Sequence, residues 1–405
     1  TADGPEKRYE DGGDAVRDFI CDKIKKIKPS GIRRLFDIAN EIPDVISLGV
    51  GEPDFDTPWH IREEGIYSLH KGRTFYTSNS GLIELREEIA RFMKRKYGLS
   101  YDPKHEIVLT VGGSEAIDIA LRAILNPGDE VIYPEPCFVS YEPCVLLSDG
   151  VPVPIELTAE TEFRLQPEQL EAAITPNTKA LLISYPNNPT GAIMEREDLE
   201  KLVPIIIKHD LLVISDEIYS ELSYRDRHVS IASLPGMLER TIVINGFSKS
   251  YAMTGWRLGF ACGPAGIIEY MLKVHQFGIM SAPTMSQYAA ISALKNGDRD
   301  ICTMAESYNQ RRRFLMEAFR EMRLPCFEPF GAFYVFPDIS EFGMGSEEFC
   351  TKLLEAENVA VVPGSAFGAC GDKYVRISYA YSIEELKEAM ARIARFIERL
   401  RMGRK

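Results

Sequence analysis

A lysine and an arginine in one short segment have the clearest chemical potential in this sequence. Lys249 comes a few residues after an apolar run and lies among small and apolar residues in NGFSKSYAMTGWRLG (245–259). A lysine in such surroundings can have a lowered pKa and act as an amine nucleophile toward a carbonyl. Arg257, eight residues later, can hold a phosphate group through two parallel hydrogen bonds. Taken singly, a solvated lysine and a structural arginine explain the two residues better than catalysis does.

Three further polar motifs also follow apolar runs. Asp216 comes directly after such a run in ISDEIYSEL, and Tyr219 lies three residues on, where a helical turn would put both on the same side. Asn188 belongs to SYPNNPTGAI (184–193), whose prolines fix the backbone around it. The turn TVGGSEA (110–116) can bring backbone N–H groups to an anion at the start of a helix. An N-cap aspartate, a proline turn and a tight strand-to-helix turn stay open as explanations of the separate motifs.

The hydrophobic pattern predicts the elements that would position these motifs. Candidate strands are short and continuously apolar, as expected of strands buried on both faces of a mostly parallel sheet, and they span 107–111, 130–134, 180–184, 211–215, 241–245 and 257–261. Helical patterns lie between them, for example at 114–125 and 195–209. The order predicts an α/β fold with a mostly parallel sheet flanked by helices. Ligands of such sheets bind at the carboxyl ends of strands, where all four motifs fall.

The C-terminal part of the chain has a different pattern. A charged helix at 300–322 is followed by short apolar runs at 331–339, 359–364 and 373–380. The last helix begins with a capping box, Ser382 with Glu385 three residues later. We therefore expect three parts: a polar N-terminal tail at 1–27, a large domain at 51–299, and a smaller α+β domain made of 28–50 and 300–405.

Composition argues against several classes of protein. Lys and Arg number 47 and Asp and Glu number 60, so the net charge is −13, which disfavours a nucleic-acid-binding or anionic-membrane-binding surface. No apolar run approaches the ~20 residues needed to span a bilayer. The eight cysteines are scattered without a Cys-x-x-Cys pair, which predicts neither a metal site nor a disulfide framework and favours a reducing compartment, the cytoplasm.

The combination of groups is more informative than any one of them. An amine nucleophile, a carboxylate, a phenol, an amide, a guanidinium and an anion-binding turn all fall at predicted strand ends. Together they match the needs of pyridoxal 5′-phosphate (PLP), whose aldehyde takes an amine, whose ring nitrogen takes a carboxylate and whose phosphate takes a cationic cradle.

The sequence also resembles the class I and II aminotransferases, in the aspartate aminotransferase-like group of PLP fold type I. The resemblance runs from about Lys28 to Arg399. It is carried by SKxxxxxGxRxG at 248–259, NPTG at 188–191, SDEIY at 215–219 and SLGVGEPDFDTP at 47–58. It implies a large domain with a mostly parallel sheet flanked by helices, and a smaller α+β domain.

The resemblance assigns cofactor roles to residues of these motifs. It implies that Lys249 binds the cofactor covalently and shuttles the substrate proton, that Asp216 pairs with the ring nitrogen and that Tyr219 contacts the ring hydroxyl. Arg257 is implied to hold the phosphate. The other implied cofactor contacts are Asn188 at the ring hydroxyl, Gly113, Ser114 and Glu115 through their backbone, Phe138 stacked on the ring, Ser248, and Tyr76 reaching the neighbouring subunit's phosphate.

One position departs from the pattern. Many relatives carry a phosphate-binding serine three residues before the lysine, where this chain has Gly246. We expect Ser248, directly before Lys249, to substitute in part.

The resemblance also implies substrate contacts and an assembly. Arg376 matches the arginine that grips the substrate α-carboxylate, although strand alternation alone would make it a surface residue. Gly51 and Asn188 are implied to lie next to the substrate. The role of Tyr76 implies a homodimer with shared active sites.

The expected activity is a ping-pong transamination. An L-amino acid, aromatic, aspartate or from a broad range, would give its amino group to a 2-oxo acid, for which we expect 2-oxoglutarate. A PLP-dependent carbon–sulfur β-lyase of the same fold is the main alternative. A nucleotide-dependent dehydrogenase lacks its G-x-G-x-x-G motif, and a PLP-binding regulator would need a DNA-binding module, for which the residues before Lys28 have no room.

Overall fold

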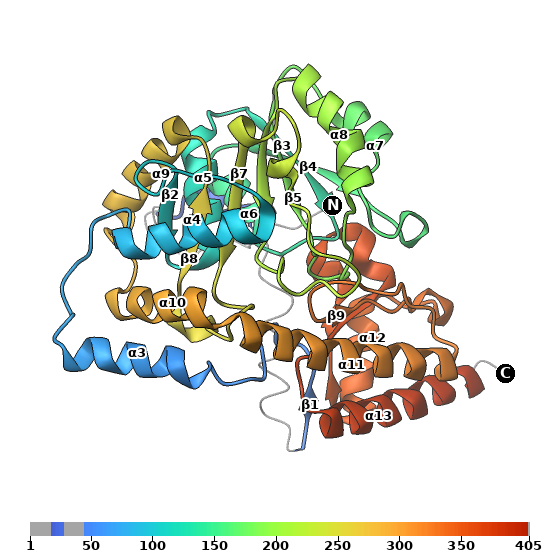
Figure 1. The fold of residues 1–405 in the computed structure, drawn as a ribbon. Helices are drawn as coiled ribbons and strands as arrows, with labels where there is room; N and C mark the ends of the chain where they lie inside the picture. Colours follow the sequence, from blue (N-terminus) through green and yellow to red (C-terminus); the bar gives the residue numbers. More distant parts are fainter. Residues whose placement is uncertain (1–17, 28–43, 404–405) are drawn as a thin grey trace, which may run out of the picture.

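The computed structural model of the protein describes residues 18–27 and 44–403. Most of the expected N-terminal tail (1–17) and the first part of the expected small domain (28–43) lie outside the described residues. The described chain forms a large sheet covered by helices, with a second group of short strands and long helices beside it (Figure 1). Element labels follow Figure 1.

The central sheet has seven strands within these ranges. Their order across the sheet is β2 (Ile107–Thr110), β8 (Gly259–Cys262), β7 (Thr241–Gly246), β6 (Leu212–Asp216), β5 (Thr178–Ser184), β3 (Glu130–Glu135) and β4 (Val151–Glu156). β8 runs antiparallel to both of its neighbours, β2 and β7, and the four pairs among β7, β6, β5, β3 and β4 are parallel. The prediction of a mostly parallel sheet flanked by helices is confirmed.

Two strand predictions were wrong in detail. The strand expected at 257–261 begins only at Gly259, because Arg257 has a left-handed backbone (φ 50°) after a short 3₁₀ turn at Thr254–Trp256. β4 was not predicted, and it contains Pro152 and Pro154. β4 lies at the sheet edge and pairs only with β3, where proline is tolerated because one side of the strand needs no ladder donors.

Both faces of the sheet are covered by helices, which explains the continuous apolar runs. On one face Ile107 and Leu109 of β2 share an apolar cluster with α3 (Trp59–His70), α4 (Ile83–Tyr97) and α10 (Thr284–Asn296). On the other face Val108 packs with α5 (Gly112–Ile124), α6 (Tyr141–Leu147) and α9 (Ala265–Gly278). Next to these, α7 (Pro167–Ala173) and α8 (Arg196–Lys208) pack on β5.

The C-terminal region builds its own layers beside this sheet (Figure 1). Its helices are α11 (Asp298–Met322), α12 (Ser346–Glu357) and α13 (Ile383–Met402). β12 (Val375–Ser378) lies between β9 (Tyr334–Val335) and β11 (Val362–Pro363) in an antiparallel sheet. β10 (Val359–Ala360) pairs in parallel with β1 (Ile46–Ser47). α1 (Asp22–Lys25) lies beside α6, where Lys23 contacts the carbonyl of Leu147 at 3.2 Å.

The segment before Gly51 packs with this C-terminal region. Leu48 belongs to an apolar cluster whose other members are mostly residues of α11, α12, α13 and the short strands. The capping box that begins α13 is confirmed, because Ser382 Oγ accepts from the N–H of Glu385 at 3.2 Å and the Glu385 carboxylate accepts from the N–H of Ser382 at 3.1 Å. The division into two domains stays a prediction. In the part of the chain that the structure describes, no helix has the length and apolar character to cross a bilayer.

Candidate active site

A cavity of about 480 Å³ opens at the carboxyl ends of the parallel strands. Ser184 ends β5, Asp216 ends β6 and Lys249 follows β7, and all three side chains line it. Most of the predicted site residues line the same cavity, namely Gly51, Gly113, Ser114, Phe138, Asn188, Asp216, Tyr219, Ser248, Lys249, Arg257 and Arg376. The topology therefore brings together residues that lie more than 300 positions apart in the sequence.

Two predicted residues do not line the cavity. The side chain of Glu115 turns away from it and contacts the N–H of Val111 and the ring of His275. Tyr76 is 77% exposed and lies on the surface of the single chain. A role for Tyr76 would therefore need a second subunit.

The amine of Lys249 is held inside the cavity. Its Nζ donates to the carbonyl of Gly51 at 2.6 Å. Burial lowers the pKa of Lys249 to about 8, helped by the positive charges of Arg376 and Arg257. A useful fraction of the amine is therefore unprotonated near neutral pH, as a nucleophile or a general base requires.

Asp216 is a buried carboxylate with neutral partners. It accepts from the hydroxyl of Tyr141 at 2.7 Å and from the N–H of Ile218 at 3.2 Å. Burial raises the pKa of Asp216 to about 6, while these two hydrogen bonds act in the opposite direction. Among the described residues no lysine, arginine or histidine forms an ion pair with it, so a cationic ligand group would complete its environment.

Arg376 is buried in the wall of the cavity, whereas strand alternation predicted a surface residue. It is only 5% exposed, and its guanidinium lies 4.5 Å from the ring centre of Tyr334. Nη1 donates to the side-chain oxygen of Asn188 at 2.9 Å, and Nη2 donates to the carbonyl of Gly49 at 2.5 Å. Alternation failed because β12 is the middle strand of a sheet that is covered on both faces.

The charge of Arg376 has no carboxylate partner in the described chain. Its Nε is buried without any hydrogen bond there, and only neutral groups accept from its two terminal nitrogens. A buried guanidinium in this state is costly unless an anion binds to it. The arrangement suits a ligand carboxylate, which can accept two parallel hydrogen bonds.

The phosphate-binding turn predicted at 110–116 forms the start of α5. Gly112 has φ +77°, a left-handed backbone that favours glycine, and a Cβ there would lie 2.5 Å from Nη2 at the end of the Arg257 side chain. Gly259 is equally confined, because its Cβ would lie 2.6 Å from the carbonyl carbon of Gly112. The turn, Arg257 and the first residue of β8 thus form one close-packed unit, with the free N–H groups of the helix start beside the guanidinium.

The glycine at position 246 has a steric reason. A Cβ there would lie 3.0 Å from the Cα of Gly259 and 3.0 Å from Cδ1 of Ile218. A serine at this position would therefore need β7 and β8 to move apart. Ser248 lines the cavity instead, and its part in holding a phosphate stays a prediction.

Sequence reasoning missed two tyrosines of the cavity. Tyr141 bonds to Asp216, and Tyr334 bonds to the hydroxyl of Tyr219 at 2.7 Å. Tyr141 lies three residues after Phe138, and its local sequence does not distinguish it from a core tyrosine. Tyr334 lies in an apolar strand, and nothing in its local pattern separates it from a core aromatic residue.

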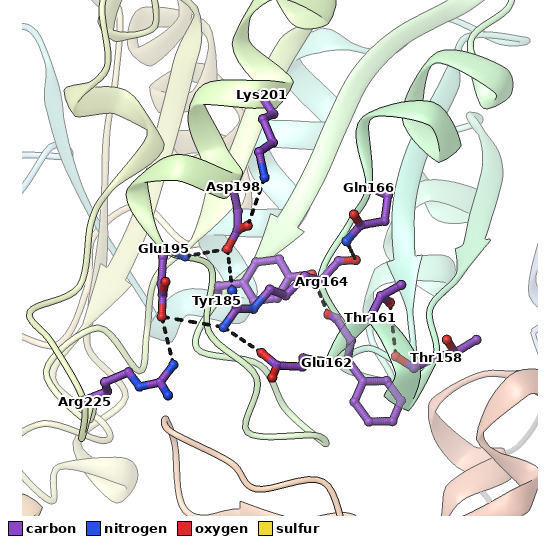
Figure 2. A network of polar contacts seen from close by, with 11 residues as sticks. Thr158, Thr161, Glu162, Arg164, Gln166, Tyr185, Glu195, Asp198, Lys201 and Arg225 are labelled. Carbon is purple, nitrogen blue, oxygen red and sulfur yellow. Dashed lines mark hydrogen bonds and ion pairs between the residues drawn. The ribbon is translucent and has the colours of Figure 1, made fainter.

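A polar network surrounds Tyr185 and Arg164 (Figure 2), and Tyr185 lies three residues before Asn188 in the sequence. Tyr185 begins the loop that carries Asn188, and its hydroxyl donates to the carbonyl of Phe163 at 2.9 Å. Arg164, which follows Phe163 in the sequence, forms an ion pair at 2.8 Å with Asp198 at the start of α8. Phe163 and Arg164 are adjacent in sequence, so the network connects the start of this loop to the start of α8.

Comparison with known proteins identifies the family. The family model of aminotransferase class I and II matches residues 43–393. The chain is 48% identical to the aspartate aminotransferase of Pyrococcus abyssi over 93% of this chain and 98% of that protein. It is 45% identical to aromatic-amino-acid aminotransferase 2 of Thermococcus litoralis, over 94% and 98% of the two chains.

A solved structure agrees with this assignment. The aspartate aminotransferase of Thermus thermophilus with maleate has a TM-score of 0.89 and 40% identity, over 94% of this chain and 100% of that one. The chain belongs to the class I and II aminotransferases, and its activity is transamination. The β-lyase alternative is not favoured, since the similar proteins are aminotransferases.

The contact between Tyr141 and Asp216 gives a testable prediction. In Tyr141→Phe the ionised carboxylate loses a hydrogen bond, so the pKa of Asp216 should rise further above its usual range. A bond to a charged group contributes ~1.5–3 kcal/mol, so the acidic limb of the kcat/KM profile should move to higher pH by about one unit. The pH profiles of the two proteins, each saturated with cofactor, measure this shift.

The control for this variant is Tyr101→Phe. Tyr101 is a buried tyrosine whose hydroxyl has no hydrogen-bond partner among the described residues, and it does not line the cavity. Its variant should keep the wild-type profile. An unshifted acidic limb in Tyr141→Phe would contradict the role of the hydrogen bond.

Proposed function

We propose that this aminotransferase holds PLP in the cavity and uses Lys249 as its reactive amine. The observation that carries the proposal is that two groups line the same cavity. One is an amine of lowered pKa, and the other is Arg376, a buried guanidinium without a carboxylate partner in the described chain. An amino acid and a 2-oxo acid share the α-carboxylate that would satisfy Arg376.

The chemistry of the lining groups fits PLP. Asp216 would hold the ring nitrogen, since it is a buried carboxylate with only neutral donors around it. Arg257 and the N–H groups of Gly113 and Ser114 would hold the phosphate, because Arg257 has no carboxylate partner among the described residues and donates only to the carbonyl of Thr254 at 3.0 Å. Phe138, Asn188, Tyr219 and Ser248 complete the proposed set.

The residues of the chain have distinct tasks in the proposed reaction. When bound, PLP supplies an electron sink for the negative charge that develops at the substrate Cα. Lys249 takes the proton from Cα, which its pKa of about 8 permits near neutral pH. Arg376 orients the substrate through its α-carboxylate. Because the same groups serve donor and acceptor in turn, we infer ping-pong kinetics.

The proposal predicts a spectral change without any acceptor. The purified protein with PLP should show a yellow absorption band, and L-glutamate alone should bleach it as the amino group moves to the cofactor. Lys249→Ala should lose catalysed bleaching, with a rate lower by ~10²–10⁴-fold or more. A wild-type band that persists with glutamate, aspartate and tyrosine alike would contradict the proposed function.

We propose an aromatic or broad range of amino donors, with 2-oxoglutarate as acceptor. The cationic side chains that line the cavity are Lys249, Arg257 and Arg376, and all three have proposed tasks. None of these lining cations is left for a side-chain carboxylate, whereas Phe138, Tyr334, Val50 and other lining groups offer apolar or aromatic surface. The relatives named for aspartate and for aromatic amino acids support both ends of this range.

Replacing Arg376 by lysine tests the proposed substrate contact. Lysine keeps the charge but cannot form two parallel hydrogen bonds, so KM for tyrosine, aspartate and 2-oxoglutarate should rise by about 10–100-fold. The cofactor should remain bound. Steady-state kinetics with each substrate, together with the cofactor spectrum, separates the two effects.

Arg312→Lys is the matched control for this test. Arg312 is also buried but pairs with Glu328 at 2.7 Å outside the cavity, so its replacement should leave every KM within about twofold. An unchanged KM in Arg376→Lys, or wild-type activity on neither tyrosine nor aspartate, would overturn the substrate assignment.

We further propose a homodimer in which Tyr76 reaches the partner's phosphate site. Phe75 and Tyr76 are 82% and 77% exposed, and the carbonyl of Phe75 accepts from Thr284 at 2.7 Å. Other large apolar side chains are exposed on neighbouring elements, namely Trp59, Ile66, Tyr67, Leu69, Tyr270, Phe277, Ile279 and Met280. Such a concentration of exposed apolar groups favours a protein–protein interface.

Light scattering should give twice the mass of the chain. Tyr76→Phe should keep that mass but weaken PLP binding about tenfold, because a hydrogen bond to the phosphate is lost. Tyr67→Phe, on the same exposed surface, should change neither quantity. A monomer with full activity would contradict the shared site.

We place the enzyme in the cytoplasm. All eight cysteines carry free thiols, a state that a reducing compartment maintains. Recovery of the activity in another fraction of the source cells would contradict this placement.

A further inference from the structure

A buried acid–histidine pair lies directly behind the phosphate-binding turn. Glu115 belongs to the first turn of α5, one residue after Ser114. One carboxylate oxygen accepts from the N–H of Val111, the residue at the N-cap of this helix. The other lies 2.6 Å from Nδ1 of His275, which comes from α9. The pair therefore connects the turn to a separate helix on the same face of the sheet.

The burial of this pair makes its geometry specific. The side chain of His275 is fully buried and that of Glu115 is 12% exposed. Nε2 of His275 is buried without a partner among the described residues, so the contact with Glu115 is the one that orients the ring. Truncating one member would leave the other with an unmet polar group inside the protein.

The carboxylate of Glu115 lies close to the place where the proposed function puts a phosphate. Gly113 and Ser114 face the cavity, where the proposed function puts a phosphate, and a carboxylate one residue further along would repel that anion if it turned the same way. The two contacts hold it away from the cavity. They also fix the N–H of Val111, and with it the backbone that leads into Gly112 and Gly113.

We propose that Glu115 and His275 are positioning residues that shape the turn at 111–114 for the cofactor's phosphate. The inference rests on the proposed function, because it takes the cavity as the PLP site. It assigns the side chain of Glu115 a task distinct from the backbone contact expected of that residue. Loss of the pair should weaken binding of the cofactor's phosphate and leave binding of the pyridine ring largely unchanged.

Binding of PLP and of pyridoxal, which lacks the phosphate, separates these two effects. The full-length chain, freed of cofactor, is titrated with each compound and followed by absorbance. Glu115→Ala should raise the Kd for PLP about tenfold and change the Kd for pyridoxal by less than about twofold. Glu115→Gln keeps an acceptor for Val111 and a donor for His275, so it should restore most of the PLP affinity.

A second pair of variants covers the case in which Glu115→Ala does not fold. His275→Asn retains a donor near the place of Nδ1 and should keep the preference for PLP, whereas His275→Leu should lose it. Asp118→Asn is the matched charge control, since it removes one negative charge from the same helix, where Asp118 pairs with Arg122 on the surface. It should behave as the wild type.

The outcomes distinguish this inference from the proposed function. A wild-type protein that binds PLP no better than pyridoxal would refute the phosphate assignment itself. A wild type that prefers PLP, with variants that lose both compounds equally or neither, would overturn the roles of Glu115 and His275 alone.

Discussion

The burial of positive charge around Lys249 is the constraint on which the rest of the site depends. Lys249, Arg257 and Arg376 line one cavity, and only Asp216 and Glu52 bring negative charge to it. Neighbouring cations and lost hydration together hold the pKa of the lysine near 8. The protein keeps the two arginines in place with neutral acceptors rather than carboxylates. The cavity therefore keeps an excess of positive charge that favours anionic ligands.

The architecture restricts the conformational freedom of the groups in this arrangement. Asp216 ends β6, which pairs with a strand on each side, and Lys249 lies in the turn that follows the fully buried strand β7. Arg376 comes from β12 in the C-terminal region. The segment at 48–51 contacts both sides of the cavity. Gly49 accepts from Arg376, and Gly51 accepts from Lys249. Rigid elements thus supply the reactive groups, and one extended segment lies between the two cations.

The sequence could predict those parts of the site that are local. The motifs around Lys249, Asp216 and Asn188 each follow an apolar run, and strand ends of a parallel sheet meet at one edge, so their convergence could be expected. The parts that failed depend on tertiary partners. Tyr334 looks like any core aromatic residue until its hydroxyl is seen to bond to Tyr219. The direction of the Glu115 side chain is set by His275, which lies 160 residues away.

The packing of Gly112, Arg257 and Gly259 has a consequence for how such sequences can vary. These residues belong to two motifs separated by more than 140 positions, yet a carbon added to Gly259 would strike the backbone of Gly112, and one added to Gly112 would meet the end of the Arg257 side chain. Gly259 cannot change alone without separating β8 from the start of α5, and a change at Gly112 would strain its left-handed backbone and displace the guanidinium of Arg257. Across related chains the three positions should therefore be inherited as a block, and a lineage that lost its chemistry would keep the glycines for as long as it kept the sheet.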